Sequence, residues 1–221
     1  MGSSSALTCS TPSPVVERFD ELDAERLREL FVELDAELAG RDEPVRVLVA
    51  GGAALAFKWS DRSTYDVDLI GGDFPADVRR AIATVAERNN LEWHWINDGG
   101  TAGTAALEPH PRPLYVGQNF QAYSPDDRYL LAMKLFAARD RDFHDAVRLS
   151  IESGITSAEA MSRLIDDAYY HNVIPPEMQS FIEEVARTAA RKTASNHHDR
   201  IQQPHSERPH RSRDDGELGL R

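Results

Sequence analysis

The feature that most constrains this chain is a pair of glycines, Gly51 and Gly52, between two apolar segments. Residues 45–50, VRVLVA, form a short valine-rich run that is typical of a strand. Residues 53–57, AALAF, then continue in a pattern that suits a helix. Because glycine lacks a Cβ atom, a phosphate can approach the backbone closely here, and the free N–H groups of a helix start would point at it. The sequence therefore predicts a strand, a glycine turn and a helix that together can bind a phosphate group.

Two aspartates follow on the next predicted strand. Residues 65–70 alternate, so that Val67 and Leu69 share one face while Asp66 and Asp68 share the other. This alternation places the Cα atoms of the two aspartates roughly 6.6 Å apart. Carboxylates at this spacing can bind one or two Mg²⁺ ions, which prefer oxygen ligands and often bind substrate phosphates as well. Such a site can activate an attacking hydroxyl and stabilise a leaving pyrophosphate.

Each motif alone has an ordinary structural explanation. An Asp-x-Asp pair is usually the solvated face of a strand, and a Gly-Gly pair is usually a turn. Their order in this chain, a strand followed by glycines, a helix and an acidic strand, favours one joint site for phosphate and metal.

The remaining pattern predicts an α+β fold, with a small mixed β-sheet and flanking helices followed by an α-helical C-terminal half. Leucines and a phenylalanine at spacings of three and four predict a helix over 23–38, which Gly40 ends. We expect a second helix over 76–89 and further strands over 91–96 and 115–122.

The C-terminal half is predicted to begin with Ser124 as an N-cap and Pro125 in the first helical turn. Further helices are expected in the segment RDFHDAVRLSIES, over 156–170 and over 175–191. The polar segment after residue 191 has little to bury, so we expect it to be disordered. The predicted organisation is a flexible lead (1–13), an α/β core (14–123), a helical domain (124–191) and a disordered tail (192–221).

The composition is that of an ordinary soluble protein, with a formal net charge of -12. This charge argues against a general attraction to nucleic acid or anionic membranes, although a local basic cluster and a divalent metal can still bind a nucleotide. The single cysteine, Cys9, cannot form an internal disulfide, and the N-terminus has no secretory signal. No apolar run approaches the ~20 residues of a membrane span, so we expect a cytoplasmic protein with no membrane partner.

The segment from Gly51 to Asp68 resembles the signature of the polymerase-β-type nucleotidyltransferase superfamily. In that signature a Gly-Gly or Gly-Ser pair precedes an Asp-x-Asp motif between apolar residues, and here 13 residues separate Gly52 from Asp66. More narrowly, four phrases are similar to a bacterial group of minimal nucleotidyltransferases that includes the AbiEii and MenT toxins. These phrases are GGAAL, RSTYDVDL, WIND and YLLAMKLFAARDRDFHDA, and the resemblance spans about residues 28–185.

The resemblance implies transfer of a nucleoside monophosphate from an NTP, with one or two Mg²⁺ ions held by the catalytic Asp66 and Asp68. In MenT toxins the acceptor is the 3′ end of tRNA, so tRNA and a cognate antitoxin protein are the partners that the resemblance suggests. The alternative is a degenerate transferase fold that serves as a nucleotide-binding or regulatory module.

Basic and acidic residues of the helical half are expected to support this site. Lys134 matches the lysine of the family's MKL phrase, which implies a catalytic ligand of the triphosphate. Arg141, Asp142 and Asp145 match its RD-x-x-D phrase. On one continuous helix, Lys134, Arg141 and Asp145 would lie within roughly 20° of one stripe. An Asp–Arg network that only holds two helices together explains the carboxylates equally well.

Arg62 and Thr64, just before the aspartate pair, are further candidates for nucleotide binding. Arg62 could reach a phosphate with two hydrogen bonds or remain a surface arginine, and Thr64 could simply begin the strand. The resemblance to polymerase-β-type enzymes also implies a third metal carboxylate from a later strand, where Asp98 and Glu108 are the candidates. We favour Asp98 because it follows the apolar stretch WHWI, although residues 97–100 also suit an ordinary turn.

Overall fold

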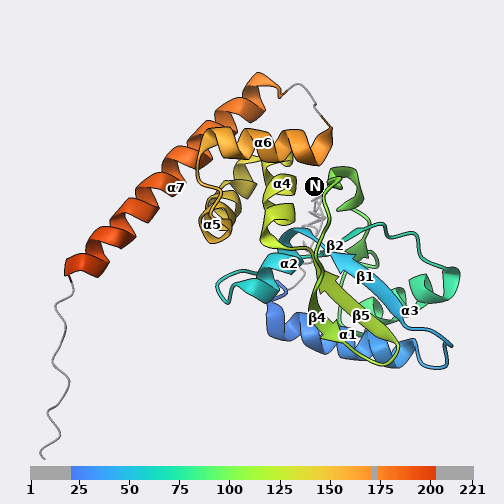
Figure 1. Cartoon of the computed structure of the whole chain (residues 1–221). Coiled ribbons are helices and arrows are strands. Elements are labelled where there is room, and N and C mark those ends of the chain that lie inside the picture. Colours follow the sequence, from blue (N-terminus) through green and yellow to red (C-terminus); the bar gives the residue numbers. More distant parts are fainter. Residues whose placement is uncertain (1–20, 171–173, 203–221) are drawn as a thin grey trace, which may run out of the picture.

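The computed structural model describes residues 21–170 and 174–202 and contains a five-stranded mixed sheet with helices around it (Figure 1). The chain completes this sheet before the C-terminal helices begin, and these helices pack mainly on one another. The predicted α+β fold class is thus confirmed.

The sheet brings the predicted glycine turn and the aspartate strand together at its centre. Strand order is β3-β2-β1-β5-β4, with β1 antiparallel to β2 and parallel to β5. Strands β2 and β3 are parallel, and β4 and β5 form an antiparallel hairpin. The strands are β1 Val45–Val49, β2 Val67–Ile70, β3 Ile96–Asn97, β4 Arg112–Val116 and β5 Phe120–Ser124.

In the part of the chain that the structure describes, three helices belong to the sheet half and four to the helical half. In Figure 1, α4 leads from the sheet into the group of α5, α6 and α7, and the C-terminal part of α7 extends away from the rest. Among the described residues, no helix combines the length and the apolar character that a membrane span requires. The helices are α1 Ala24–Glu37, α2 Gly51–Lys58, α3 Ala76–Arg88, α4 Asp127–Ala137, α5 Phe143–Ser153, α6 Ala158–Tyr169 and α7 Pro176–Gln202, with short 3₁₀ turns at Thr101–Gly103 and Asp140–Asp142.

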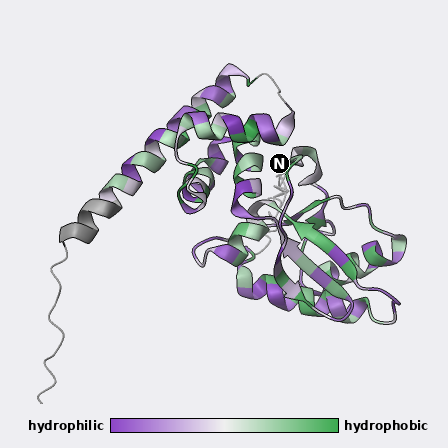
Figure 2. Ribbon diagram, in the orientation of Figure 1, coloured by the Kyte–Doolittle hydropathy of each residue, from purple (hydrophilic) through white to green (hydrophobic). Residues whose placement is uncertain are grey.

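The core of the sheet half is built around Phe31 on α1. Its ring lies 5.8 Å from that of Phe57, 6.0 Å from that of Tyr115 and 5.3 Å from that of Phe120, measured between centroids. The colouring in Figure 2 shows hydrophobic residues along β1 and a mixture of both kinds along the helices, as expected when only one face of a helix is buried. This aromatic cluster joins α1, α2 and the β4–β5 hairpin into one layer.

The predicted strand over 115–122 is wrong, because the chain turns within it. Gly117 N donates to the carbonyl of Phe120 at 2.9 Å, which closes the turn between β4 and β5. The carboxylate of Asp35 on α1 accepts hydrogen bonds from Asn119 N and Phe120 N, both at 2.7 Å. A carboxylate far away in the sequence therefore stabilises this turn, and local strand propensity does not reveal it.

The predicted strand over 91–96 is also too long, since only Ile96 and Asn97 form β3. Trp95 is buried, and its indole Nε1 donates to the carbonyl of Ile82 on α3 at 3.2 Å, whereas Trp93 is 74% exposed. The segment before β3 is thus held against α3 by Trp95 and does not form a strand at the edge of the sheet.

The helix starts and ends of the C-terminal half differ from the prediction at three places. Ser124 ends β5, and Asp126 is the N-cap of α4, with its carboxylate accepting from Tyr129 N at 2.9 Å. The second helical segment, expected from Arg141, begins later, because the chain breaks at Ala138, which has a left-handed φ of 44°, and α5 starts only at Phe143. Helix α7 continues to Gln202 and so includes the start of the predicted tail over 192–221. The predicted lead over 1–13 and residues 203–221 lie outside the described residues.

We expect Phe31→Ala to lower the free energy of unfolding by about 3–5 kcal/mol, because it removes the ring at the centre of the aromatic cluster. Val32→Ala is the matched control on the same helix, since Val32 is 56% exposed, and it should change stability by less than about 0.5 kcal/mol. Chemical denaturation of both variants measures the difference. Equal effects would show that Phe31 is not central to the core.

Candidate active site

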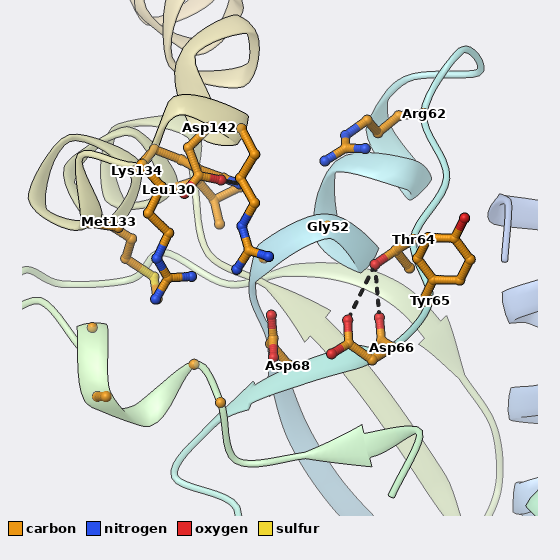
Figure 3. A pocket seen from close by; sticks show the side chains of 18 of the residues that line it. Gly52, Arg62, Thr64, Tyr65, Asp66, Asp68, Leu130, Met133, Lys134 and Asp142 are labelled. Carbon is orange, nitrogen blue, oxygen red and sulfur yellow. Dashed lines mark hydrogen bonds and ion pairs between the residues drawn. The ribbon is translucent and has the colours of Figure 1, made fainter. Parts of the chain in front are cut away.

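Asp66 and Asp68 lie side by side at the start of β2 and project into the same cleft (Figure 3). Val67 and Leu69 are buried on the other face of the strand, as the alternation predicts. The carbonyl of Asp68 accepts a hydrogen bond from Ala50 N at 2.8 Å, which ties the aspartate strand to the end of β1. Because Ala50 immediately precedes α2, this bond places the carboxylates beside the start of that helix.

The two residues that flank the Asp68 carboxylate, Gly51 and Gly99, must be glycines, because the carboxylate oxygens lie where their Cβ atoms would be. A Cβ atom on Gly51 would lie 2.4 Å from Asp68 Oδ2, and one on Gly99 would lie 2.4 Å from Asp68 Oδ1. Gly51 also has a φ of +61°, a left-handed conformation that favours glycine. The backbones of Gly51 and Gly99 thus come close to the two oxygens of the Asp68 carboxylate. Because glycine has no side chain, neither residue covers these oxygens.

Gly52 is needed for a different contact. A Cβ atom on Gly52 would lie 2.5 Å from Thr64 Oγ1. The hydroxyl of Thr64 lies at hydrogen-bond distance from the carbonyl of Asp66, at 3.1 Å, and from its Oδ1, at 3.4 Å (Figure 3). Gly52 therefore lets Thr64 reach the aspartate pair, while the N-terminal turn of α2 has no side-chain cap of its own.

The helical half supplies the opposite wall of the cleft. The ammonium of Lys134 on α4 forms ion pairs with Asp142 and, at 3.0 Å, with Asp145. Arg62, from the loop before β2, reaches the same carboxylate of Asp145 at 3.2 Å. The side chain of Lys134 is 13% exposed and those of the two aspartates are 8% exposed. Lys134 and the two aspartates are nearly buried, and the more exposed Arg62 completes a charge-balanced network that joins the two halves of the protein.

Two further arginines line the cleft outside this network. Arg139 and Arg141 are exposed, and neither side chain has an ion pair or hydrogen bond within residues 21–170 and 174–202. Their charges act on Asp68, which places both arginines within electrostatic reach of it. The cleft thus has an acidic wall on β2 and a wall on the helical side with two uncompensated positive charges.

The cleft between these walls has a volume of about 820 Å³. Figure 3 shows Lys134, Met133 and Asp142 on one side, and Gly52, Thr64 and Asp66 on the other. Tyr65 stands at the rim with 61% of its surface exposed, and its hydroxyl donates to Glu21 at 2.8 Å. The residues predicted for the site that line this cleft are Gly51, Gly52, Arg62, Thr64, Asp66, Asp68, Lys134, Arg141 and Asp142.

Asp145 and Asp98 are placed differently from the other candidates. Asp145 lies behind the wall and acts through Lys134 and Arg62. Asp98 is exposed and does not line the cleft, and neither does the other candidate for a third carboxylate, Glu108. In the described part of the chain, no group of three or more His, Cys, Asp or Glu side chains is arranged to hold a metal ion.

Asn97 and Gly99 are contributors to the site that the sequence pattern did not reveal. Asn97 Nδ2 donates to Asp66 Oδ2 at 3.3 Å, and the backbone of Gly99 approaches Asp68. Both residues fall in a segment that also suits an ordinary turn. The apolar stretch that ends at Ile96 was the one sequence signal for this role. It could have indicated that Asn97 is the last residue of a strand.

The electrostatics of the aspartate pair fit a divalent cation. Burial is the main cause that raises the pKa of Asp68 above its usual value, and the charge of Asp66 adds to it. The cations Lys134, Arg139 and Arg141 oppose this rise. A bound cation would relieve the repulsion between the carboxylates, and Asp66 and Asp68 offer the hard oxygen ligands that Mg²⁺ prefers. The room that Gly51 and Gly99 leave around Asp68 is consistent with such a ligand.

Comparison with known families agrees with this geometry. The model of a family described as nucleotidyltransferases of unknown function, DUF6036, matches residues 25–182. The chain belongs to this family. No curated protein and no solved structure matches the chain. The matched residues include both walls of the cleft, so the nucleotidyltransferase family is established, whereas the narrower likeness to the AbiEii and MenT toxins stays a prediction.

We expect Asp145→Ala to destabilise this nucleotidyltransferase-family protein by about 3–5 kcal/mol, because Lys134 and Arg62 lose a nearly buried partner. The control is Glu159→Ala, whose pair with Arg163 is exposed and should contribute less than about 1 kcal/mol. Urea unfolding of both variants provides the comparison. A loss below 1 kcal/mol for Asp145→Ala would mean that the network does not hold the two halves together.

We expect Asp68→Asn to raise the melting temperature by a few degrees in the presence of a chelator. An acid whose pKa is higher in the folded state binds protons more tightly there, so stability falls as the pH rises from the unfolded pKa to the folded pKa, and this cost persists at neutral pH. The amide removes the cost. Added Mg²⁺ should stabilise the wild type and not the variant, because ligand binding favours the folded state.

The control for this measurement is Asp98→Asn, which removes one charge near the same end of the sheet but outside the cleft. It should leave both the melting temperature and the response to Mg²⁺ unchanged. An equal response of Asp68→Asn and wild type to Mg²⁺ would exclude Asp68 as a metal ligand.

Proposed function

We propose that this protein is a Mg²⁺-dependent enzyme that transfers a nucleoside monophosphate from an NTP to an acceptor hydroxyl. One observation carries the proposal. The half-buried carboxylates of Asp66 and Asp68 face Arg139 and Arg141, which form no ion pair within the described residues, across one cleft that also includes the start of α2. Carboxylates for a metal and cations for phosphates are the two kinds of group that such a transfer requires, since catalysis there is mainly positioning and charge stabilisation.

The size of the cleft agrees with a nucleotide. Its volume of about 820 Å³ falls within the range of roughly 300–1,000 Å³ typical of small-molecule sites. The triphosphate would lie between the N-terminal turn of α2 and the arginines, where backbone N–H groups and guanidinium groups both favour anions.

The residues of the chain would then have separate tasks. Arg139 and Arg141 would bind the phosphates, together with Lys134, whose ammonium already contacts Asp142 on the same wall. Asp66 and Asp68 would hold Mg²⁺, which supplies charge neutralisation of the phosphates and lowers the pKa of the attacking hydroxyl. Thr64 would keep Asp66 in place through its hydroxyl.

The reaction itself is a substitution at the α-phosphorus of the NTP. The oxygen of the acceptor hydroxyl forms a bond to this phosphorus and loses its proton, while the bond to the β-phosphate bridge breaks and pyrophosphate leaves. Cations beside the phosphates stabilise the charge that develops on the leaving group.

For the acceptor we propose the 3′ end of tRNA, and for the biological role a toxin with a cognate antitoxin partner, on the strength of the resemblance to the AbiEii and MenT group. The overall charge of -12 does not attract RNA, so the attraction must be local. Arg139 and Arg141 are the charges beside the cleft that can provide it.

The test incubates the protein with Mg²⁺, total tRNA and each α-labelled NTP in turn. We expect label on tRNA from at least one NTP, and a loss of more than about 100-fold for Asp68→Ala, because the metal loses a direct ligand. Arg139→Ala and Arg141→Ala should each raise the KM for NTP by about 10–100-fold, the effect of losing a charge-assisted hydrogen bond.

Arg128→Ala is the matched control, because Arg128 is exposed on α4, pairs with Asp167 and lies outside the cleft. It should leave the KM unchanged. Tight binding of NTP without any transfer would favour the alternative, a nucleotide-binding module. Growth arrest on expression that Asp68→Ala relieves would support the toxin role, and unchanged growth would remove that role without affecting the enzyme.

A further inference from the structure

Asn97 on β3 lies directly beside the aspartate pair of β2. Strand β3 runs parallel to β2, with Asn97 paired to Asp68 and Ile96 paired to Val67. Ile96 and Val67 are both buried, so Asn97 shares the opposite face with the carboxylates. Asn97 Nδ2 donates to Asp66 Oδ2, and a Cβ atom on Gly99 would lie 2.4 Å from Asp68 Oδ1 and 2.6 Å from Asn97 Oδ1, so the three side chains lie close together.

The orientation of the Asn97 carboxamide is determined by two contacts. Its Oδ1 accepts a hydrogen bond from Gly99 N at 2.6 Å, and an N–H group can only be paired with an acceptor. The opposite orientation would place Nδ2 against that N–H and Oδ1 against the carboxylate of Asp66, so both contacts would be lost. Nδ2 therefore faces Asp66, and the amide supplies a donor where a carboxylate would add a negative charge.

We propose that Asn97 is a positioning residue that holds Asp66 and, by being neutral, limits the protein alone to one divalent ion. Asp66 and Asp68 contribute two negative charges, which match one divalent cation. No third carboxylate in the described part of the chain joins them. A second ion would then bind only with the NTP, because the phosphates supply the missing negative oxygens. This last step rests on the proposed transfer of nucleotides, whereas the count of ions on the protein alone does not.

The variant that tests the proposal is Asn97→Asp. Its Oδ1 can still accept from Gly99 N, so the turn keeps its hydrogen bond, and only the group that faces Asp66 changes from a donor to a carboxylate oxygen. The matched control is Asn90→Asp, the same substitution at an exposed residue with a left-handed φ of 50°, a conformation that aspartate tolerates.

The measurement is binding of Mn²⁺, followed by its EPR signal and by calorimetry, without nucleotide. We expect one Mn²⁺ per wild-type chain, and binding at least about tenfold tighter, or a second ion, for Asn97→Asp, because the number of charged ligands sets the affinity. The melting temperature of Asn97→Asp should fall in a chelator and recover with Mn²⁺. Asn90→Asp should match the wild type in all three respects.

Two Mn²⁺ ions on the wild type, no Mn²⁺ on the wild type, or unchanged binding by Asn97→Asp would each overturn the proposal. If Asn97→Asp does not fold, Asn97→Ala is the variant to measure. Loss of the donor to Asp66 should weaken binding of Mn²⁺ at the single site. An unchanged affinity for Mn²⁺ would contradict the positioning role. The transfer assay is separate. One Mn²⁺ ion with the expected response of Asn97→Asp, but no transfer from any NTP, would refute the proposed function and leave this inference intact.

Discussion

Among the described residues, Asp145 is the most buried acidic side chain that forms an ion pair between the two halves of this protein. It accepts from Lys134 on α4 and from Arg62 in the loop before β2, so one buried anion joins the helical half to the aspartate strand. Asp142 completes the charge balance. Because removal of one partner would leave uncompensated charge in a nearly buried place, this network specifies how the wall of the cleft lies against the sheet.

That network also divides the cations of the cleft into those with a carboxylate partner and those without one among the described residues. The charge of Lys134 is already compensated, and Arg62 is committed to the same carboxylate, although both line the cleft. Four basic and four acidic side chains line the cleft, and Arg139 and Arg141 are the two of these cations without an ion pair among the described residues, in a chain whose formal net charge is -12. The overall charge therefore says little about the cleft, where the balance is decided by a few groups at short range.

The sequence predicted the parts of the fold that depend on local pattern. The alternation around Asp66 and Asp68 and the break at Gly51 and Gly52 identified the centre of the sheet, because strand and turn signals there come from adjacent residues. The hairpin turn before Phe120 could not be predicted in this way, since Asp35 on α1 stabilises it. The role of Asn97 was equally hidden, because its contact with Asp66 depends on the register between β2 and β3. Residues 97–100 suit a turn, so the sequence alone did not indicate that Asn97 ends a strand.

The break between α4 and α5 shows how such a non-local feature affects the site. On one continuous helix, Arg139 and Arg141 would lie about 200° apart around the axis, so one would point away whenever the other faced the cleft. The left-handed Ala138 ends α4 after one last bond, from its own N–H to the carbonyl of Lys134 at 3.1 Å. The short 3₁₀ turn that follows allows both arginines to line the same cleft while Asp142 returns to Lys134. The irregular backbone is thus what places two uncompensated cations opposite two carboxylates.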